Sequence, residues 1–360
     1  MSSLKDVKYE PFEVERFANA QWEEVTRYHN EVQAWLFPEL PAKSLETVKQ
    51  IYTSKDPRRD IHRVMAWDDS REKMYGAGGL YTSSTKDPKH EENKHIGTLR
   101  ITVRELYRRQ KVATNILRQL ARKAKELDVT TLQGKADLEP GKAFCQKHGA
   151  KIAGRAFLSR LKIEDVDFDM INQWRREGEK RAEGVVLERY STIPEEHIDE
   201  FISLTTELVE LEREIARGSG DEESVEGHYV LDAETYYHRA KESAKQGAES
   251  VIILSREPDG RFSGMTDVSY NRKTEPGMVW QGLTGVRRAY QGRGIGKWLK
   301  AEMIAYLKEH YPGMTEIDTG NATTNAPMLS INRRLGFQTV RDNVTFKISV
   351  DELLERLGSA

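Results

Sequence analysis

The feature that most constrains the fold is an internal repeat. Residues 101–120 read ITVRELYRRQKVATNILRQL, and residues 284–303 read TGVRRAYQGRGIGKWLKAEM. Both segments place a valine, a tyrosine, a basic cluster and a small residue in the same order before a helical pattern. Each is followed further along by a predicted helix that ends in glycine, within FCQKHGA and INRRLGF. A repeat at domain length indicates duplication of one fold, unless two α/β segments agree by chance.

Apolar periodicity predicts the same order of elements in both halves of the chain. The halves favour an α/β (α+β) protein with domains at 1–165 and 185–360, joined by a polar linker helix over 166–184. In the first half we expect strands at 62–67, 75–82 and 95–103, helices at 114–127 and 140–148, and two strands within 151–163. In the second half we expect strands at 251–255, 264–270 and 278–286, helices at 296–310 and 326–335, and strands within 338–348.

Composition narrows the class of protein. The 360 residues are 38% hydrophobic and 32% charged, as in globular proteins, and the net charge of −2 gives little support for a nucleic-acid or membrane surface. There is no apolar run of the roughly 20 residues that span a bilayer, and the N-terminus lacks the apolar core of a secretory signal. Cys145 is the single cysteine, and His228 and His238 lack companions at metal-ligand spacing, so we expect no disulfide, no metal and a cytoplasmic protein.

A glycine-rich turn carries the strongest chemical signal. The run Q-G-R-G-I-G at 291–296 follows a predicted strand and opens an amphipathic helix. Glycines leave room for an anion, and the free N–H groups of a first helical turn point at it. A dinucleotide fingerprint belongs to the first strand of a βαβ unit, and a Walker loop needs Gly-Lys-Ser/Thr. The run lies late in the chain, which does not suit a dinucleotide fingerprint, and Trp298 follows Gly296-Lys297 where a Walker loop needs serine or threonine.

The run has the form Q/R-x-x-G-x-G/A, with V-R-R-A-Y before it and N-x-x-M-L-x-x-N-x-x-L-G-F at 325–337 after it. In these three ordered motifs the chain resembles the GCN5-related N-acetyltransferase (GNAT) superfamily. The resemblance is clear over 251–348 and fainter over 62–163, so the chain is similar to tandem GNAT proteins such as mycothiol synthase-like enzymes. It implies two GNAT domains, each with a mixed, mostly antiparallel central sheet flanked by helices.

The resemblance also implies a cofactor, acetyl-CoA, and the residues that hold it. Its pantetheine arm would pair with the backbone of the strand before the turn, where a backbone N–H near Val286 would polarise the thioester carbonyl. The pyrophosphate would lie on the turn and the first helical residues. The implied cofactor-binding residues are Thr284, Gly285, Val286, Gln291, Gly292, Arg293, Gly294, Ile295, Gly296, Lys297, Asn321 and Asn325.

The implied reaction is direct attack of a primary amine on the acyl-CoA, with a base for the amine proton and an acid for the leaving thiolate. The position where the family often has a tyrosine acid is Asn332, which cannot donate a proton in this way. Asp267 and Asp318 are candidate bases because each lies in or beside a predicted core strand, although a structural role suits either. Gln281 is expected to orient substrate or backbone.

The first copy of the motif differs at the turn. Residues 108–113 read R-R-Q-K-V-A, with Lys111 where the first obligatory glycine belongs. We expect this copy to bind coenzyme A poorly and to support the fold. The alternative is that lysine is tolerated and both copies bind.

The expected function is therefore an acetyl-CoA-dependent N-acetyltransferase that acts on a small-molecule amine as a monomer or homodimer, as in antibiotic resistance or thiol-cofactor synthesis. The alternatives are a non-catalytic protein that responds to coenzyme A, and a protein N-acetyltransferase. An acidic segment at 207–226 suits either a lid over a cationic amine or a solvated loop. Its acidic residues are Glu207, Glu210, Glu212, Glu214, Asp221, Glu222, Glu223 and Glu226.

Overall fold

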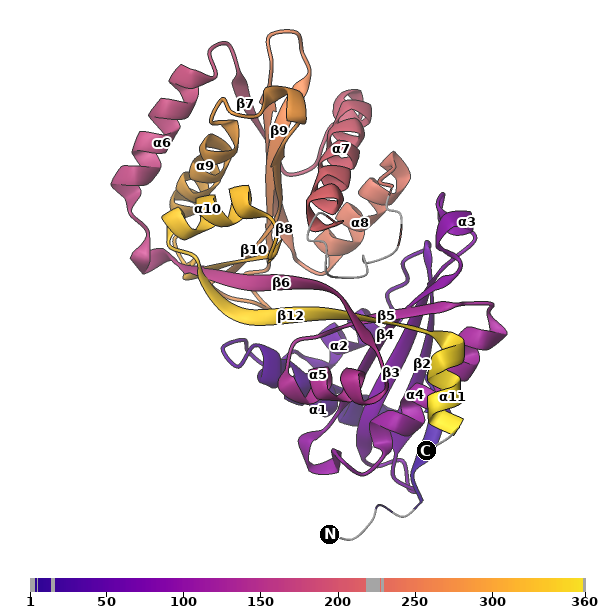
Figure 1. Ribbon diagram of the computed structural model, residues 1–360. Coiled ribbons are helices and arrows are strands. Elements are labelled where there is room, and N and C mark those ends of the chain that lie inside the picture. The colour runs from indigo at the N-terminus through magenta and orange to yellow at the C-terminus, as the bar shows by residue number, and fades with distance from the viewer. Residues whose placement is uncertain (1–3, 5, 14–16, 218–226, 228–229, 359–360) are drawn as a thin grey trace. The chain divides into compact units, whose positions relative to one another are not determined.

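The computed structural model describes residues 4, 6–13, 17–217, 227 and 230–358 (Figure 1). The chain divides into two compact units, and neither of them is continuous in sequence. The first unit is built from 1–154 and 343–360, and the second from 155–221 and 229–342. The predicted boundaries followed the halves of the sequence, whereas these units exchange the last strand of each half. Strand pairing over such distances leaves no local sequence pattern.

The first unit is a mixed sheet in the order β1-β2-β3-β4-β5-β12. Neighbouring strands are antiparallel except for the parallel pair β4 and β5. One apolar core joins the sheet to α4 and α11, and another joins it to α1 and α2. The bounds are β1 Lys8–Pro11, α1 Asn19–Leu36, α2 Leu45–Thr53, β2 Arg59–Trp67, β3 Met74–Ser83, α3 His90–Asn93, β4 Ile96–Val103, α4 Val112–Glu126, β5 Thr131–Ala136, α5 Glu139–Lys147, β12 Gln338–Ser349 and α11 Val350–Gly358.

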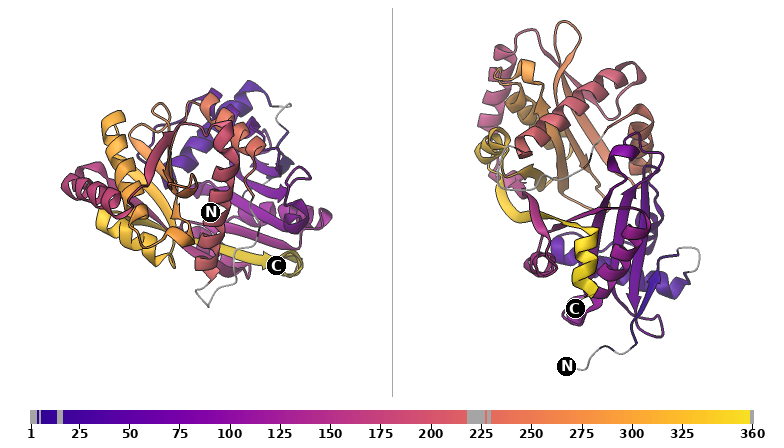
Figure 2. Two further views of the ribbon diagram at one scale, coloured as in Figure 1. Left: turned by 90° about the horizontal axis from the view of Figure 1, so that it is seen from above. Right: turned by 45° about the vertical axis from the view of Figure 1, so that its right-hand side comes forward.

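The second unit repeats this plan in the order β6-β11-β10-β9-β8-β7, with β10 and β11 as its parallel pair. Helices α6, α9 and α10 cover one face of the sheet and α7 and α8 the other, as Figures 1 and 2 show. The mixed, mostly antiparallel sheet flanked by helices is thus confirmed. The bounds are β6 Lys151–Lys162, α6 Phe168–Arg181, β7 Val186–Tyr190, α7 Ile198–Arg217, α8 Ala233–Lys245, β8 Glu249–Arg256, β9 Phe262–Tyr270, β10 Met278–Val286, α9 Ile295–His310, β11 Glu316–Ala322 and α10 Ala326–Leu335.

Local sequence accounts for several helix ends. Ser44 caps α2 by accepting the N–H of Thr47, and Asn325 caps α10 by accepting the N–H of Met328. Helix α10 ends at Gly336, whose φ of +98° suits a left-handed C-terminal cap.

Two strands are longer than the sequence predicted. The segment 151–163 was expected to hold two strands and 338–348 more than one, and each is instead one 12-residue strand, β6 or β12. Each of these strands has residues in both units; β6 pairs with β11 over 156–162, and β12 pairs with β5 over 344–349. Helix α11, which follows β12, was not predicted; its Val350, Leu353 and Leu357 complete the core of the first unit.

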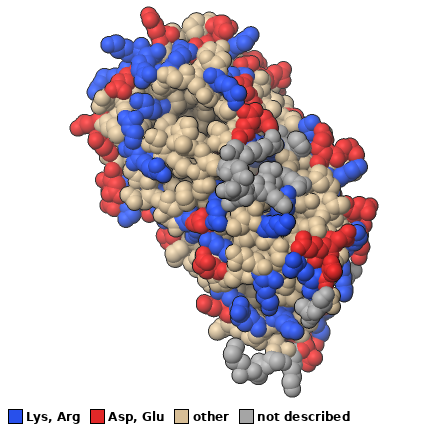
Figure 3. All heavy atoms as spheres, viewed as in Figure 1, with Lys and Arg blue, Asp and Glu red and all other residues tan. Residues whose placement is uncertain are grey.

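The surface carries charges of both signs. Lysine and arginine alternate with aspartate and glutamate over the face drawn in Figure 3, consistent with the net charge of −2. Among the described residues, none of the helices combines the length and apolar character needed to cross a membrane.

Candidate functional site

The glycine-rich turn of the second unit joins β10 to α9 in a conformation that favours glycine. Gly292 has a φ of +81° and Gly294 a φ of +85°, in the left-handed region that L-residues rarely adopt. A Cβ added at Gly292 would meet no heavy atom within 4 Å, so the turn is open at this point. Gln291 closes the turn by donating its side-chain N–H to the carbonyl of Val286, at 3.0 Å.

The start of α9 presents unpaired amide groups at this turn. The N–H of Trp298 donates to the carbonyl of Gly294, at 3.1 Å. Because helical hydrogen bonds begin there, the N–H groups of Ile295, Gly296 and Lys297 have no acceptor within the helix. Together with the positive end of the helix dipole, they form a favourable place for an anion.

Basic side chains around the turn are already engaged with protein groups. Arg293 donates to both carboxylate oxygens of Glu257, at 2.8 and 2.9 Å, and Lys297 lies 3.8 Å from the carboxylate of Glu177. Arg181, from the helix that sequence analysis assigned to a linker, donates to the carbonyl of Gly292 at 3.0 Å. The groups available to an anion at this turn are therefore mainly the backbone amides, with Arg181 beside them, because Arg293 is paired with Glu257.

Strand β10 separates from β11 just before the turn. The two strands pair in parallel only from Met278 to Gln281, while β10 stays paired with β9 as far as Val286. The backbone of Thr284, Gly285 and Val286 thus has a strand neighbour on one side only. An open strand edge leads directly into the glycine turn.

A β-bulge between Gln281 and Thr284 marks the point where β10 separates, and Asp267 of β9 holds it. The Asp267 carboxylate accepts the backbone N–H of Leu283. A Cβ added to Gly282 would lie 2.4 Å from an oxygen of that carboxylate, so any other residue would force Asp267 or the strand to shift. Asp267 is partly exposed, but its burial among protein atoms raises its pKa to about 7. The hydrogen bond from the Leu283 N–H acts in the opposite direction and lowers this pKa. A carboxyl group with this pKa suits proton transfer near neutrality.

A buried polar network lies behind the separation, and its central residue was missed by sequence analysis. The ammonium of Lys300, on α9, donates to the side-chain oxygens of Gln281 (2.7 Å) and Asn332 (2.8 Å). Asn332 in turn donates to the side-chain oxygen of Asn321, at 2.7 Å. The sequence did contain one signal that Lys300 is buried. This lysine stands three, four and seven residues before the buried Met303, Ile304 and Leu307, which places it on the buried face of the helix.

Other candidate residues have structural partners. Asn325 caps α10, so its side-chain oxygen is in use. Asp318 is fully buried and accepts two hydrogen bonds from Arg160, at 2.7 and 2.9 Å, which favours the structural role that sequence analysis kept open for it. In the acidic segment, Glu207 pairs with Arg287 and Glu214 with Arg288. Four of its predicted members lie outside the described residues, namely Asp221, Glu222, Glu223 and Glu226.

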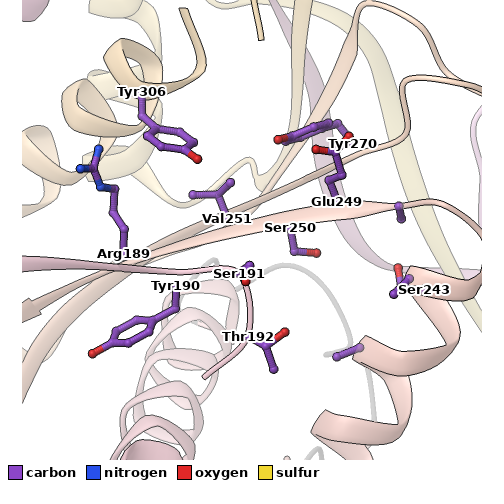
Figure 4. A pocket seen from close by; sticks show the side chains of 13 residues that line it. Arg189, Tyr190, Ser191, Thr192, Ser243, Glu249, Ser250, Val251, Tyr270 and Tyr306 are labelled. Atoms are coloured by element: carbon purple, nitrogen blue, oxygen red, sulfur yellow. The ribbon is translucent and has the colours of Figure 1, made fainter. Parts of the chain in front are cut away.

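A separate hollow of about 560 Å³ lies beyond the end of β7, where β8 begins and β9 ends. Figure 4 shows Arg189 and Tyr306 on one side of it and Glu249 and Tyr270 on another. The guanidinium of Arg189 lies over the Tyr306 ring, at 5.1 Å from its centroid. This hollow is at the opposite end of β9 and β10 from the glycine turn, and its lining shares no residue with the groups described above.

The segment that contains this site is similar to a known protein family. Residues 209–337 match the model of the acetyltransferase (GNAT) family, and these residues contain the glycine turn, the bulge and the buried network. No curated protein matches the sequence. This segment is similar to GNAT acetyltransferase domains.

The whole chain has the tandem GNAT fold. It is similar to a tandem GNAT protein from the clavulanic acid biosynthesis pathway, with a TM-score of 0.70 and 18% identity over 96% of this chain and 99% of that one. It is also similar to a GNAT protein from Sphaerobacter thermophilus, with a TM-score of 0.62 and 14% identity over 95% and 96%. A glucosamine N-acetyltransferase region of a fungal multi-domain β-N-acetylglucosaminidase gives a TM-score of 0.65 and 14% identity, over 95% of this chain and 38% of that one.

Proposed function

We propose that the second unit binds acetyl-CoA and transfers the acetyl group to a primary amine of a small molecule by direct attack in a ternary complex. The observation that carries this proposal is the open glycine turn, continuous with the one-sided edge of β10. An anion-binding helix start next to unpaired strand backbone suits a ligand that has a diphosphate at one end and an amide-containing arm. Coenzyme A has both groups.

Different residues of this chain would bind different parts of the coenzyme. The amides of 292–297, with Arg181 close by, would hold the diphosphate. The free edge of Thr284, Gly285 and Val286 would pair with the amides of the arm, and an N–H near Val286 would polarise the thioester carbonyl. The absence of a Cβ at Gly292 keeps the approach to this cradle clear. When bound, acetyl-CoA supplies an activated acyl group.

Asp267 is the proposed base for the amine proton. It lies on the α7 and α8 face of the sheet, beside the bulge, and its pKa of about 7 lets it exist as a carboxylate at neutral pH while still binding a proton effectively. Since it also accepts the Leu283 N–H, Asp267 couples the shape of the bulge to proton transfer. Gly285 allows α7 to approach this region closely, because an added Cβ would lie 2.9 Å from Leu208.

The acceptor is proposed only as a class. The described acidic side chains Glu207 and Glu214 pair with arginines, so they do not argue for a cationic acceptor. A tandem GNAT protein of an antibiotic pathway and a glucosamine N-acetyltransferase region are among the similar structures, which makes amino acids, amino sugars and amine antibiotics the first acceptors to test. The predicted likeness to mycothiol synthase-like enzymes adds amino-sugar thiols to that group.

The test is incubation of the full chain with acetyl-CoA and a panel of such amines, with measurement of coenzyme A thiol release and of the acetylated product by mass spectrometry. We expect turnover on at least one amine. Tight binding of acetyl-CoA without turnover on any amine would favour the non-catalytic, coenzyme-responsive alternative. Turnover on lysine-containing peptides alone would favour protein acetylation.

A further inference from the structure

The ammonium of Lys300 is buried among neutral hydrogen-bond partners. Only 1% of the residue is exposed, and its two hydrogen bonds go to the amide oxygens of Gln281 and Asn332. The ring of Phe337 lies 5.3 Å away on another side. Burial lowers the pKa of Lys300 to about 7. A cation buried without a carboxylate partner destabilises a fold, so an apolar residue would serve packing better.

The first unit shows that the fold does not need this cation. Lys300 follows Gly294 by six residues, and Leu117 follows Lys111 by six in the equivalent helix. Leu117 is buried in the apolar core of its unit. Asn332 stands four residues before Gly336, and Cys145 stands four before Gly149. The polar network therefore occurs in the unit with the open turn and is replaced by leucine and cysteine in the other.

The network lies where the strands separate. Gln281 is the last residue of β10 that pairs with β11, and it accepts the Lys300 hydrogen bond. Lys300 also belongs to the helix whose start forms the anion cradle, five residues beyond Ile295, or roughly 7.5 Å along the axis. An arm that leaves the cradle and follows Val286, Gly285 and Thr284 backward reaches this point. The reactive end of the coenzyme would meet the network there.

We propose that Lys300 is the proton source for the sulfur of the coenzyme when the acyl group leaves. This inference rests on the proposed function. Lys300 passes a proton from its ammonium to the sulfur as the carbon–sulfur bond breaks, and the electron pair of that bond stays on sulfur. The amine nitrogen forms the new bond to the acyl carbon and loses its proton to Asp267. Asp267 then releases its proton to water and Lys300 takes one up from water, so both groups return to their starting states and the products are a free thiol and an N-acyl product.

The amides of the network set the direction of the ammonium. Asn332 is fixed by its own donation to Asn321, and Gln281 by donation to the hydroxyl of Thr266, at 3.2 Å. Glu302 of α9 pairs with Arg175 of α6, and Asp318 of β11 pairs with Arg160 of β6, so these two carboxylates have basic partners other than Lys300. Burial is thus the influence that sets the pKa of Lys300.

The test compares the full-length protein with Lys300→Leu, which copies the leucine of the first unit. Lys308→Leu makes the same chemical change on the same helix, at a lysine that lies over Phe168 and outside the network. Ionisation of the bound coenzyme A thiol is followed by thiolate absorbance as pH rises. The protein's only cysteine does not interfere near neutrality, because burial raises the pKa of Cys145 to about 11.

We expect Lys300→Leu to bind coenzyme A within about threefold of wild type, to raise the pKa of the bound thiol by about one unit, and to lower kcat about 100-fold. Lys308→Leu should match wild type in all three measurements. An unchanged thiol pKa and kcat in Lys300→Leu would overturn the inference. So would a drop in Tm together with loss of coenzyme binding in both Lys300→Leu and Lys300→Met, because that result assigns the lysine a structural role. Failure of the wild-type protein to bind coenzyme A would instead overturn the proposed function.

Discussion

The two glycine-turn positions of the repeat share a backbone conformation but not their residues. In the second unit, Gly292 and Gly294 have φ values of +81° and +85°. In the first unit, Arg109 and Lys111 occupy the equivalent places with φ values of +63° and +62°. A non-glycine residue in this region costs roughly 1–2 kcal/mol. The turn from strand to helix therefore has the same backbone shape in both units, with glycines in one and long basic side chains in the other.

The strands before the two turns also differ, because their pairing is regular in the first unit and interrupted in the second. Strands β3 and β4 pair without interruption from Gly76 to Thr82, whereas β9 and β10 contain the bulge held by Asp267. One fold therefore supports both a regular, apolar interior and a polar, distorted one. The distortion occurs where we propose the chemistry.

The largest expected effect comes from placing a charge on the open turn. Gly294→Glu introduces a side chain at a φ of +85° and a carboxylate beside the expected diphosphate. We expect the affinity for acetyl-CoA to fall by at least 100-fold, about 2.7 kcal/mol, in isothermal titration calorimetry. Lys111→Glu is the matched change in the first unit and should alter affinity less than twofold. A greater loss from Lys111→Glu would assign the coenzyme to the first unit.

The bulge can be tested with a single methyl group. Gly282→Ala would place a Cβ 2.4 Å from the Asp267 carboxylate, so β10 or Asp267 must shift. We expect a loss of about 2 kcal/mol in unfolding free energy and a marked fall in kcat/KM. Gly320→Ala on β11 is the control for stability, since its Cβ would meet nothing within 4 Å. Equal stability of the two variants in urea titrations would contradict the close contact.

The pH dependence of the second unit should reflect Asp267. Its folded pKa of about 7 lies above the ordinary value of 3.8, so the folded protein binds more protons than the unfolded chain between these values. The contribution of Asp267 to stability therefore decreases as pH rises from 3.8 to 7. Activity changes in the opposite direction on the acid side, because the carboxylate is the base, so kcat/KM should rise as pH approaches 7. Above pH 7 it should fall, because the proposed proton donor Lys300 also has a pKa of about 7 and loses its proton. Asp267→Asn should lower kcat/KM about tenfold or more near pH 7 and remove the rise on the acid side. A rise that persists in the variant would identify another base.

The smallest effect is expected in the first turn. Lys111→Gly relieves a left-handed lysine but adds chain entropy to the unfolded state, so we expect a gain of no more than about 1 kcal/mol in unfolding free energy. Thermal unfolding measures it directly. Calorimetry on a Gly294→Glu background shows whether Lys111→Gly also creates affinity for coenzyme A. A measurable gain there would mean that the first unit lacks only a glycine.

The repeat, the sheet of each half and the glycine turn could be predicted from the sequence, because each has a local pattern of residues. Sequence analysis placed Asp267 and Gln281 on the correct strands, since apolar alternation fixes strand positions. It missed Lys300, because helix periodicity marks that position as apolar, and it missed the part of Arg181 at the turn, because contact between distant helices has no local signature. The bulge at 282–283 was equally hidden, as it depends on one carboxylate across a strand pair.

The crossing strands have a consequence for how such a protein can be divided. β5 in the first unit pairs with β12, which lies in the second half of the sequence, and β11 in the second unit pairs with β6, which lies in the first half. A cut at the apparent junction, near residue 184, would leave each fragment with a bare β-edge, a common starting point for aggregation. The two halves of the sequence are therefore not the two folding units, and fragments for separate study would have to follow the strand pairing instead.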